Sequence, residues 1–421
     1  MTTTVQPYRP QLADVQQARY LVNQVALRTP TTVNKNLSLQ YQATIGLKRE
    51  DLQIVRSYKL RGAYHKIATL SPTDIAQGIV CASAGNHAQG VAYACQQLQV
   101  QGSIFMPITT PQQKVTQVRL FGGSFVEIHL IGDTFDDSLE AAQAYCATQN
   151  ACFIHPFDDP KIIEGQATIA YEILEDAAQS IDYLILPIGG GGLAAGVSSV
   201  FKLLSPKTTI IGVEPQGAPS MQQALNANKN ITLEQIDKFV DGAAVKQVGN
   251  YTFDICQETL DEVLLVPEGL VCKTLLKLYN EEAMVVEPAG ALSVAALELL
   301  GERIQNKQVV CLISGGNNDI SRTEEIRERA LLYEQLKHYF IVNFPQRAGA
   351  LREFLIDVLG PKDDIVYFQY IKKNNRAKGP AMVGIELKNA KDLQPLIERM
   401  KTKHFFEQHL NHHPDLFHFL V

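Results

Sequence analysis

Short apolar runs alternate with longer amphipathic stretches through most of the chain. The runs are nearly continuous in Val, Ile, Leu and Ala, as in strands buried on both faces, and the stretches repeat their apolar positions at helical spacing. This alternation predicts an α/β fold, with doubly wound parallel sheets in two lobes. The predicted strands are 78–82, 103–106, 124–128, 152–154, 183–187, 209–213, 264–266 and 309–314. The predicted helices are 89–98, 112–121, 135–148, 161–179, 193–204, 268–282 and 289–300.

The first 70 residues follow a less regular pattern. Apolar positions at helical spacing predict a helix within 11–29. Apolar and polar residues alternate in 37–43 and 45–50, which predicts two short strands. A helix over 60–69 follows, and Ser57 is a suitable N-cap for it.

The composition and the order of predicted elements change after residue 320. A helix rich in Arg and Glu, predicted over 320–337, resembles a connector. Beyond it a strand, helix, strand, strand, helix pattern predicts a small α+β domain over 338–421. Its predicted elements are 339–343, 349–359, 365–372, 381–386 and 390–400. We therefore expect an α/β body over 1–330, with a smaller lobe at about 60–155, and a boundary near 321–338.

Composition narrows the class of protein. The 421 residues carry a formal net charge of −6, whereas a nucleic-acid-binding protein normally has a basic stripe. The seven cysteines are odd in number and scattered, so we expect neither a disulfide framework nor a metal site. Residues 1–10 lack the apolar segment of a secretory signal, and no apolar run reaches the roughly 18 residues of a membrane helix. We expect a soluble, cytoplasmic protein.

One lysine stands in an unusual setting at 57–62. Lys59 lies between Tyr58 and Arg61, just before Gly62. A lysine that acts as an amine nucleophile must lose its proton, and burial and nearby positive charge both lower its pKa. Arg61 is a candidate for that charge and Tyr58 for part of an apolar wall. Taken alone, the stretch is more typical of a solvated helix face.

Four consecutive glycines, Gly189 to Gly192, follow a predicted strand and precede a predicted helix. Backbone N–H groups in such a turn form an anion nest, and the helix N-terminus adds partial positive charge, so the turn suits a phosphate. The spacing matches no nucleotide P-loop, and Glu214 gives only a weak match to a dinucleotide-binding pattern. The alternative is a tight structural turn.

Two further polar turns follow predicted strands. The first, at 83–87, reads Ser-Ala-Gly-Asn-His, and its N–H groups suit a carboxylate. The second, at 314–318, reads Ser-Gly-Gly-Asn-Asn and begins with the hydroxyl of Ser314. His87 alone is more often structural than catalytic. An amine, a phosphate nest, a carboxylate nest and a hydroxyl together suit a phosphorylated aldehyde cofactor held as a Schiff base on Lys59, beside a substrate that carries a carboxylate.

These four motifs, in this order, resemble the tryptophan-synthase-β-like (fold type II) pyridoxal-phosphate enzymes. Within that group the chain is similar to threonine dehydratase (threonine ammonia-lyase) in its short biosynthetic form. The resemblance covers about residues 11–330, and the tail is similar to the family's single ACT-like regulatory unit.

The resemblance implies a role for each motif. Lys59 and Ser314 are the catalytic pair, with Lys59 as the Schiff-base lysine and Ser314 at the pyridine nitrogen. The other implied cofactor-binding residues are Tyr58, Asn86, Gly189, Gly190, Gly191, Gly192, Leu193 and Glu287. Tyr58 flanks the ring and Asn86 bonds its 3′-oxygen. The implied substrate-carboxylate loop is Ser83, Ala84, Gly85, Asn86 and His87.

The implied reaction is the deamination of L-threonine, with loss of water, to 2-oxobutanoate and ammonia, the first step of isoleucine biosynthesis. Related serine racemases have a serine where this chain has Ala84, which favours a lyase here. Some relatives bind a cation with two acids near 214–220, but Ser220 replaces the second acid. The resemblance also implies feedback inhibition by isoleucine, with valine as a further effector, and a homo-oligomer, either a dimer or a tetramer.

Other functions remain open from the sequence. The chain could act mainly on L-serine, as a dehydratase or racemase of the same fold. It could also be a non-catalytic phosphate-binding sensor that the tail regulates. The tail itself could be a dimerisation module that binds no effector.

Overall fold

The computed structural model describes residues 8–370 and 378–412, and the chain divides into two compact units. The first is Met1–Asp319 and the second is Ile320–Val421. The predicted strand 365–372 runs past Tyr370, so its last two residues lie outside the described part. No described helix is long and apolar enough to cross a membrane.

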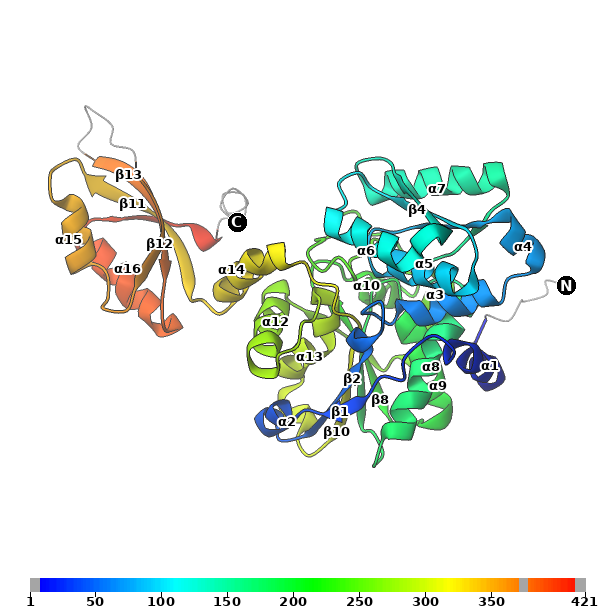
Figure 1. The fold of residues 1–421 in the computed structure, drawn as a ribbon. Helices are drawn as coiled ribbons and strands as arrows, with labels where there is room; N and C mark the ends of the chain where they lie inside the picture. The colour runs from blue at the N-terminus through cyan, green and yellow to red at the C-terminus, as the bar shows by residue number, and fades with distance from the viewer. Residues whose placement is uncertain (1–7, 371–377, 413–421) are drawn as a thin grey trace. The chain divides into compact units, whose positions relative to one another are not determined.

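The larger sheet of the first unit has six strands in the order β1-β2-β10-β7-β8-β9. All neighbours are parallel except β1 and β2. The helices α8 and α9 cover one face, and α12 and α13 lie on the other (Figure 1). The strands are β1 (Thr31–Val33), β2 (Thr44–Arg49), β7 (Tyr183–Pro187), β8 (Thr209–Pro215), β9 (Glu262–Val266) and β10 (Gln308–Ile313).

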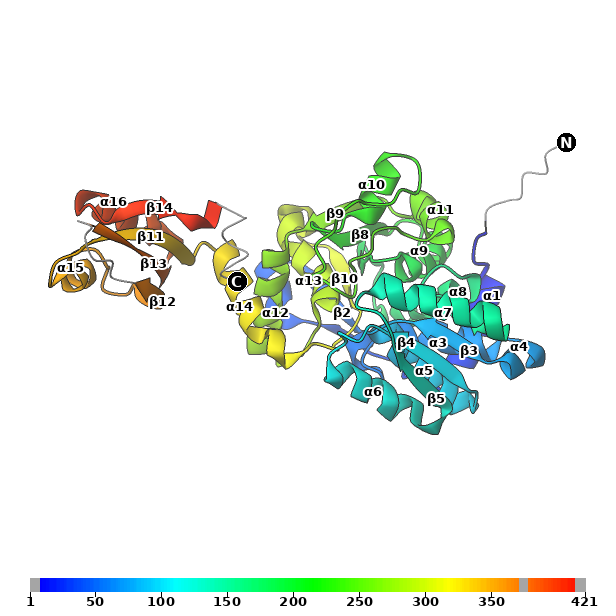
Figure 2. The same ribbon diagram turned by 90° about the horizontal axis from the view of Figure 1, so that it is seen from above.

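The smaller sheet is parallel throughout, in the order β5-β4-β3-β6. Helix α7 lies on one face and α5 and α6 on the other (Figure 2). The strands are β3 (Ile79–Ala82), β4 (Gly102–Met106), β5 (Val126–Leu130) and β6 (Cys152–Phe153). The strands and the helices that cover them match the doubly wound pattern predicted from the apolar runs.

The first unit contains α1 (Leu12–Val22), α2 (Lys35–Tyr41), α3 (Lys59–Ala68), α4 (Pro72–Gln77), α5 (Asn86–Leu98), α6 (Gln112–Gly122), α7 (Phe135–Gln149), α8 (Pro160–Asp176), α9 (Gly192–Leu204), α10 (Ser220–Asn226), α11 (Asn250–Thr259), α12 (Glu268–Glu282) and α13 (Pro288–Leu300). Two apolar cores, one centred on α8 and α9 and one on α3 and α5, hold several of these helices on the sheets.

Two local predictions near the N-terminus are wrong. The predicted strand at 37–43 is helix α2, because the side chain of Asn34 accepts the Leu37 N–H and caps the helix start. Ser57 does not cap α3. Tyr58 holds the cap position, and Ser57 forms an antiparallel bridge with Gly315. The buried Ser57 hydroxyl has no hydrogen-bond partner among the described residues.

Helix α3 is fixed by four buried charges, which we call the buried ion cluster: Lys48, Glu50, Arg61 and Glu172. The Arg61 guanidinium donates to Glu50 at 2.8 Å and to Glu172 at 2.7 Å. Lys48 Nζ donates to Glu172 as well. Each positive side chain is fully buried, so each needs its carboxylate partners. The cluster ties β2, α3 and α8 together.

Helices α3 and α8 also approach each other closely. Glycines face each other at the crossing, and a methyl group on Gly165 would lie 2.6 Å from the Cα atom of Gly62. Because that neighbour is backbone, a side chain at this position would force the helices apart.

Gly165→Ala should therefore destabilise the first unit by about 1–3 kcal/mol, the usual range for overpacking. Urea unfolding and calorimetry of the full chain measure the change. Gly46→Ala is the matched control, because its methyl group would meet only ordinary contacts at 3.6 Å. Equal stability of the two variants would contradict the close crossing.

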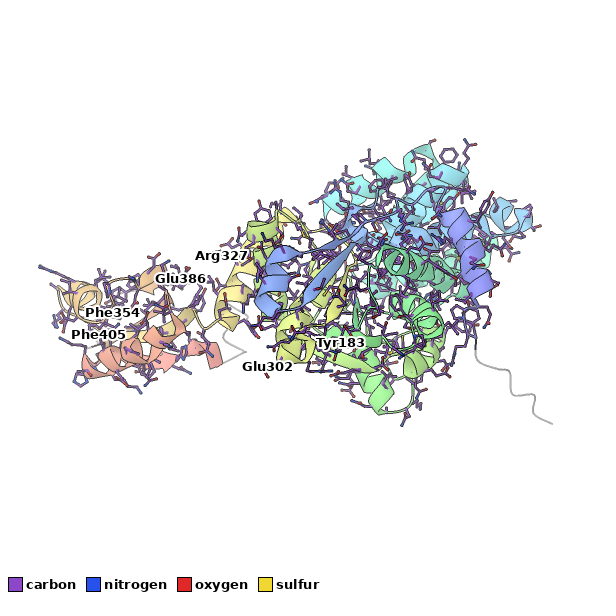
Figure 3. The ribbon with its side chains drawn as sticks, turned by 90° about the horizontal axis from the view of Figure 1, so that it is seen from below. Tyr183, Glu302, Arg327, Phe354, Glu386 and Phe405 are labelled. Carbon is purple, nitrogen blue, oxygen red and sulfur yellow. The ribbon has the colours of Figure 1, made fainter. Side chains whose placement is uncertain are left out.

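The second unit is a four-stranded antiparallel sheet in the order β12-β13-β11-β14. Its aromatic core includes Phe354 and Phe405, whose ring centres lie 5.3 Å apart (Figure 3). Its elements are α14 (Thr323–Tyr333), β11 (Lys337–Pro345), α15 (Ala350–Asp357), β12 (Asp364–Tyr370), β13 (Lys378–Glu386), α16 (Leu393–Thr402) and β14 (Phe406–His409). The sequence did not predict β14.

The predicted connector helix, α14, is part of the second unit. Arg327 on this helix pairs with Glu386 of β13 at 2.8 Å (Figure 3). Glu328 binds Lys337 and accepts the Tyr339 hydroxyl at 2.7 Å. These last three side chains are buried, so α14 is held firmly on the sheet of the second unit.

Candidate active site

Lys59 is the first residue of α3, at the carboxyl edge of the larger sheet. Its amine donates to the carbonyl oxygen of Pro156 at 2.8 Å and lies 5.3 Å from the ring centre of Tyr58. The side chain is part-buried. Loss of hydration lowers the pKa of Lys59 to about 8, while the nearby Glu287 acts in the opposite direction. A useful fraction of the amine is therefore uncharged near neutral pH.

The structure corrects the expected role of Arg61. The sequence suggested that its charge lowers the pKa of Lys59. Instead the guanidinium is held by Glu50 and Glu172, and the lowered pKa of Lys59 comes from loss of hydration. Arg61 fixes the helix on which Lys59 stands.

A segment that the sequence did not single out joins the parts of this site. It is 154–158, which follows β6. The Ile154 carbonyl oxygen lies 2.9 Å from His87 Nε2, and the Pro156 carbonyl accepts from Lys59. The ring of Phe157 lies against Gly190. We call this stretch the bridging segment.

The four-glycine turn lies between β7 and α9, and its back is tightly packed. A methyl group on Gly190 would lie 2.2 Å from Phe157, and one on Gly189 would lie 3.0 Å from Ala243. Gly191 has a positive φ of 92°. Close packing therefore explains the glycines at these positions. An anion at this turn would instead be bound by the first-turn N–H groups of α9, which have no acceptor within the helix.

The 83–87 turn leads into α5. The Gly85 N–H donates to Ser83 Oγ at 3.2 Å, and Ala84 between them has no polar side chain. Burial and the charge of Lys59 lower the pKa of His87 to about 3. His87 is therefore neutral, and its ring contacts the Ile154 carbonyl of the bridging segment.

Asn86, Glu287 and Asn317 form a polar chain beside Lys59. Asn86 Nδ2 donates to Glu287 Oε1 at 2.7 Å, and Asn86 Oδ1 accepts from Asn317 Nδ2 at 2.7 Å. Burial, followed by the charge of Asp241, raises the pKa of Glu287 to about 7. Asn317 lies in the 314–318 turn, and the sequence predicted no role for it.

Backbone bonds bring the Ser314 turn against the lysine turn. The Tyr58 N–H donates to the Ser314 carbonyl at 3.1 Å, and the Gly316 N–H donates to the Arg56 carbonyl at 2.9 Å. The Glu287 N–H donates to the Gly315 carbonyl at 3.2 Å. Ser314 is buried. Three chain segments distant in sequence thus meet at one edge of the sheet.

Glu214 lies outside this group. Its carboxylate accepts the N–H groups of Met221 and Gln222 at 2.7 and 2.9 Å, at the start of α10. Burial raises the pKa of Glu214 to about 8. The hydroxyl of Ser220 donates to the Val245 carbonyl. Among the described residues, the Glu214 carboxylate and the Ser220 hydroxyl therefore form hydrogen bonds with backbone groups.

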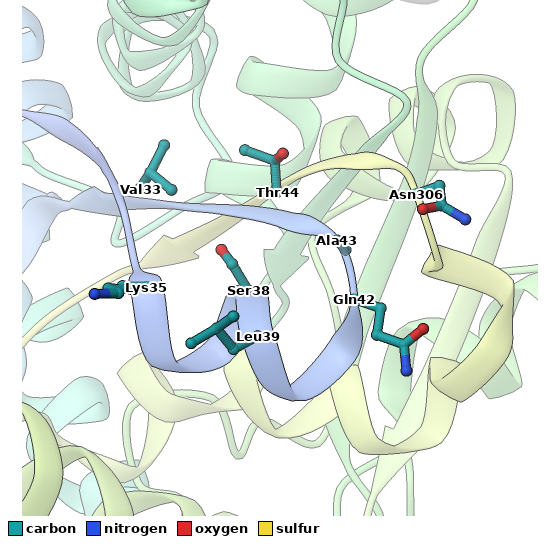
Figure 4. Close-up of a pocket in the computed structure, with 8 residues that line it drawn as sticks. All are labelled: Val33, Lys35, Ser38, Leu39, Gln42, Ala43, Thr44 and Asn306. Carbon is teal, nitrogen blue, oxygen red and sulfur yellow. The ribbon is translucent and has the colours of Figure 1, made fainter.

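A surface pocket of about 470 Å³ lies apart from the site (Figure 4). Its walls come from α2, the strand ends beside it and the turn before β10. The lining residues are Val33, Lys35, Ser38, Leu39, Gln42, Ala43, Thr44 and Asn306. None of them belongs to the polar chain or to a glycine turn.

Comparison with known proteins gives the family. The model of pyridoxal-phosphate dependent enzymes matches residues 22–315. The model of the C-terminal regulatory domain of threonine dehydratase matches residues 328–420. The biosynthetic L-threonine dehydratase IlvA of Bacillus subtilis (strain 168) is 56% identical over 98% of this chain and 97% of its own length. The chain belongs to the pyridoxal-phosphate-dependent threonine dehydratases.

Two other members agree with this assignment. The biosynthetic L-threonine dehydratase IlvA of Halalkalibacterium halodurans is 53% identical over 98% of this chain and 99% of its own length. The processed form of threonine deaminase isoform 2 from Solanum lycopersicum superposes with a TM-score of 0.72 at 39% identity, covering 78% of this chain and 91% of that chain. The predicted fold class and the predicted cofactor, pyridoxal 5′-phosphate, are confirmed.

The residues present fit the family's cofactor. Lys59 supplies a part-buried amine with a lowered pKa, which is the group that forms a bond to an aldehyde. The start of α9 supplies N–H donors for a phosphate, and its helix is 13 residues long. Asn86 has a second Nδ2 hydrogen beyond the one given to Glu287. The donor set therefore matches a phosphorylated aldehyde whose ring carries an oxygen substituent.

The lowered pKa of Lys59 predicts a specific pH dependence for the cofactor-free protein. Because the unfolded chain holds this proton up to pH 10.5 and the folded chain only to about pH 8, stability should rise between these values. Lys59→Met removes the titration, so its advantage over the wild type should be full below pH 8 and vanish above pH 10.5.

The advantage should be at most about 3 kcal/mol, at 1.36 kcal/mol per pKa unit. Urea midpoints of both proteins at pH 7 and pH 10.5 measure it. A difference that stays constant between the two pH values would show that the amine is not desolvated.

Proposed function

We propose that this chain deaminates L-threonine to 2-oxobutanoate and ammonia, as the first step of isoleucine biosynthesis. The observation that carries the proposal is the Lys59 amine. It is desolvated, faces Glu287 and lies at the meeting point of three polar turns. Membership of the threonine dehydratases supports the substrate.

Each turn then has one binding task. Lys59 holds the cofactor covalently, and Tyr58 flanks the ring. The N–H groups of the four-glycine turn and of Leu193 bind the phosphate at the start of α9. Asn86 donates to the ring oxygen through its second Nδ2 hydrogen, and the Ser314 hydroxyl meets the ring nitrogen.

The bound cofactor supplies an electron sink for the charge that develops at the substrate Cα. The substrate amine would first displace Lys59 Nζ from the cofactor, and the freed Nζ would then take the Cα proton, because it is the amine with the lowered pKa. Ser314 is a hydroxyl and gives no proton to the ring nitrogen, so the sink is weak. That favours immediate loss of the β-hydroxyl over storage of the charge.

The 83–87 turn suits the substrate carboxylate. The first-turn N–H groups of α5 have no acceptor within the helix, and Ser83 and Asn86 stand beside them. Ala84 has no hydroxyl, so this turn offers no second acid or base for the opposite face of the substrate. One-sided proton removal favours elimination over racemisation.

The assay for 2-oxobutanoate tests this proposal directly. The wild type with L-threonine should release 2-oxobutanoate and ammonia in equal amounts. Lys59→Ala should lose at least about 1,000-fold in rate, together with the visible absorbance of the bound cofactor, because base and covalent anchor are one atom. Turnover that survives in Lys59→Ala would contradict the role of Lys59.

Comparison of kcat/KM for L-threonine and L-serine separates the alternatives. One methyl group in a pocket is worth about 1–3 kcal/mol, so a preference of 10- to 200-fold for threonine is expected. A preference for serine, or formation of D-serine, would favour the serine dehydratase or racemase. A colourless protein that binds phosphate without turnover would favour the sensor.

The second unit carries the regulatory part of the proposal. It matches the C-terminal regulatory domain of threonine dehydratase, and we expect isoleucine to bind it and inhibit, with valine as a further effector. We also expect a homo-oligomer, a dimer or a tetramer.

Isoleucine should lower the activity of the full chain several-fold at subsaturating threonine. A chain that ends at Asp319 retains both apolar cores of the first unit, so it should keep its activity and lose the response. Initial rates with and without isoleucine measure this. Equal inhibition of both proteins would place the effector in the first unit.

A further inference from the structure

Asn317 makes three hydrogen bonds in and around the polar chain that it forms with Asn86 and Glu287. Its side-chain Nδ2 donates to the Val55 carbonyl oxygen at 2.9 Å and to Asn86 Oδ1 at 2.7 Å. Its backbone N–H bonds to the Glu287 carboxylate. All three contacts cross to residues far away in the sequence, although Asn317 lies only three positions after Ser314.

These bonds set the direction of two side-chain amides. The Val55 carbonyl can only accept, so it must face the Asn317 NH₂ group. The same NH₂ group faces Asn86, which must therefore present its oxygen. Asn86 Nδ2 is then turned toward Glu287. The orientation passes from a backbone carbonyl, through Asn317, to Asn86.

Glu287 alone does not fix Asn86. An ionised Glu287 accepts from Asn86 Nδ2, but a protonated Glu287 can donate to Asn86 Oδ1 after a flip of the amide. The pKa of Glu287, about 7, populates both states near neutrality. The charged and titratable groups that act on Glu287 are Asp241, Lys114, Lys59 and Tyr58.

We propose that Asn317 is a positioning residue, which fixes the amide of Asn86 so that one Nδ2 hydrogen always faces the ring oxygen of the cofactor. The inference rests on the proposed function, which places Asn86 at that oxygen. With Asn317 in place, the donor is present whether or not Glu287 is protonated. Without it, Asn86 turns its carbonyl to the ring oxygen whenever Glu287 gains a proton.

Asn317→Ala tests the relay in the full-length holoenzyme. Its dissociation constant for pyridoxal phosphate should rise about 10-fold, the loss that corresponds to one hydrogen bond. Its visible absorption maximum should shift between pH 6 and pH 8, while the wild type keeps one maximum over that range. Asn318→Ala is the matched control, since no bond joins the Asn318 side chain to Asn86.

A second pair of variants separates positioning from general support of the fold. In an Asn86→Ala background, Asn317→Ala should change the dissociation constant less than 2-fold, because there is no amide left to orient. If Asn317→Ala folds poorly, Asn317→Leu keeps the volume and removes the donor, and the same shift with pH should appear.

Three outcomes would overturn the inference. They are a 10-fold loss that persists in the Asn86→Ala background, a pH-independent spectrum in both Asn317 variants, and an unchanged dissociation constant in Asn86→Ala. The proposed function fails by a different result, which is the absence of 2-oxobutanoate from a wild-type protein that binds the cofactor normally. The two failures are therefore distinguishable.

Discussion

Two positive and two negative side chains are buried together behind Lys59. The buried ion cluster joins β2, α3 and α8, and Arg61 at its centre is two residues from Lys59. Buried charges tolerate little displacement, because each loses its compensation when a partner moves. The start of α3 is therefore held in place from behind. On its other side, Lys59 meets the carbonyl of Pro156 and the ring of Tyr58.

Much of the architecture was predictable because short stretches of sequence determine it. Continuous apolar runs indicated the parallel strands, and the lysine and the glycine turns are each visible within six residues. The bridging segment was not predictable. It acts through the carbonyls of Ile154 and Pro156, and every residue has a carbonyl, so no side-chain pattern marks it. The short helix α2 was missed for a different reason, since its alternating residues resemble a strand and a single cap decides the outcome.

The roles of charged residues were the least accessible to the sequence. Arg61 stands beside Lys59, yet its partners are 11 and 111 residues away. Sequence proximity suggested an electrostatic effect on the lysine, and the fold directs the charge elsewhere. The four glycines show a related limit. Their spacing suggested a phosphate, but packing against Phe157 and Ala243 already requires small residues there. The free N–H groups at the start of α9, and not the number of glycines, are the feature that suits an anion.

The order of strands in the larger sheet dictates when the site can form during synthesis. Strand β2 pairs with β10, which is made much later. Asn86 likewise cannot form its hydrogen bond with Asn317 until Asn317, 231 residues later, has been made. At roughly 5–20 residues per second, the ribosome needs roughly 10–50 s to supply that partner. The smaller sheet comes from one continuous stretch and can assemble meanwhile. The nascent chain thus lacks the bond between Asn86 and Asn317 until Asn317 emerges, and the second unit is made only after it.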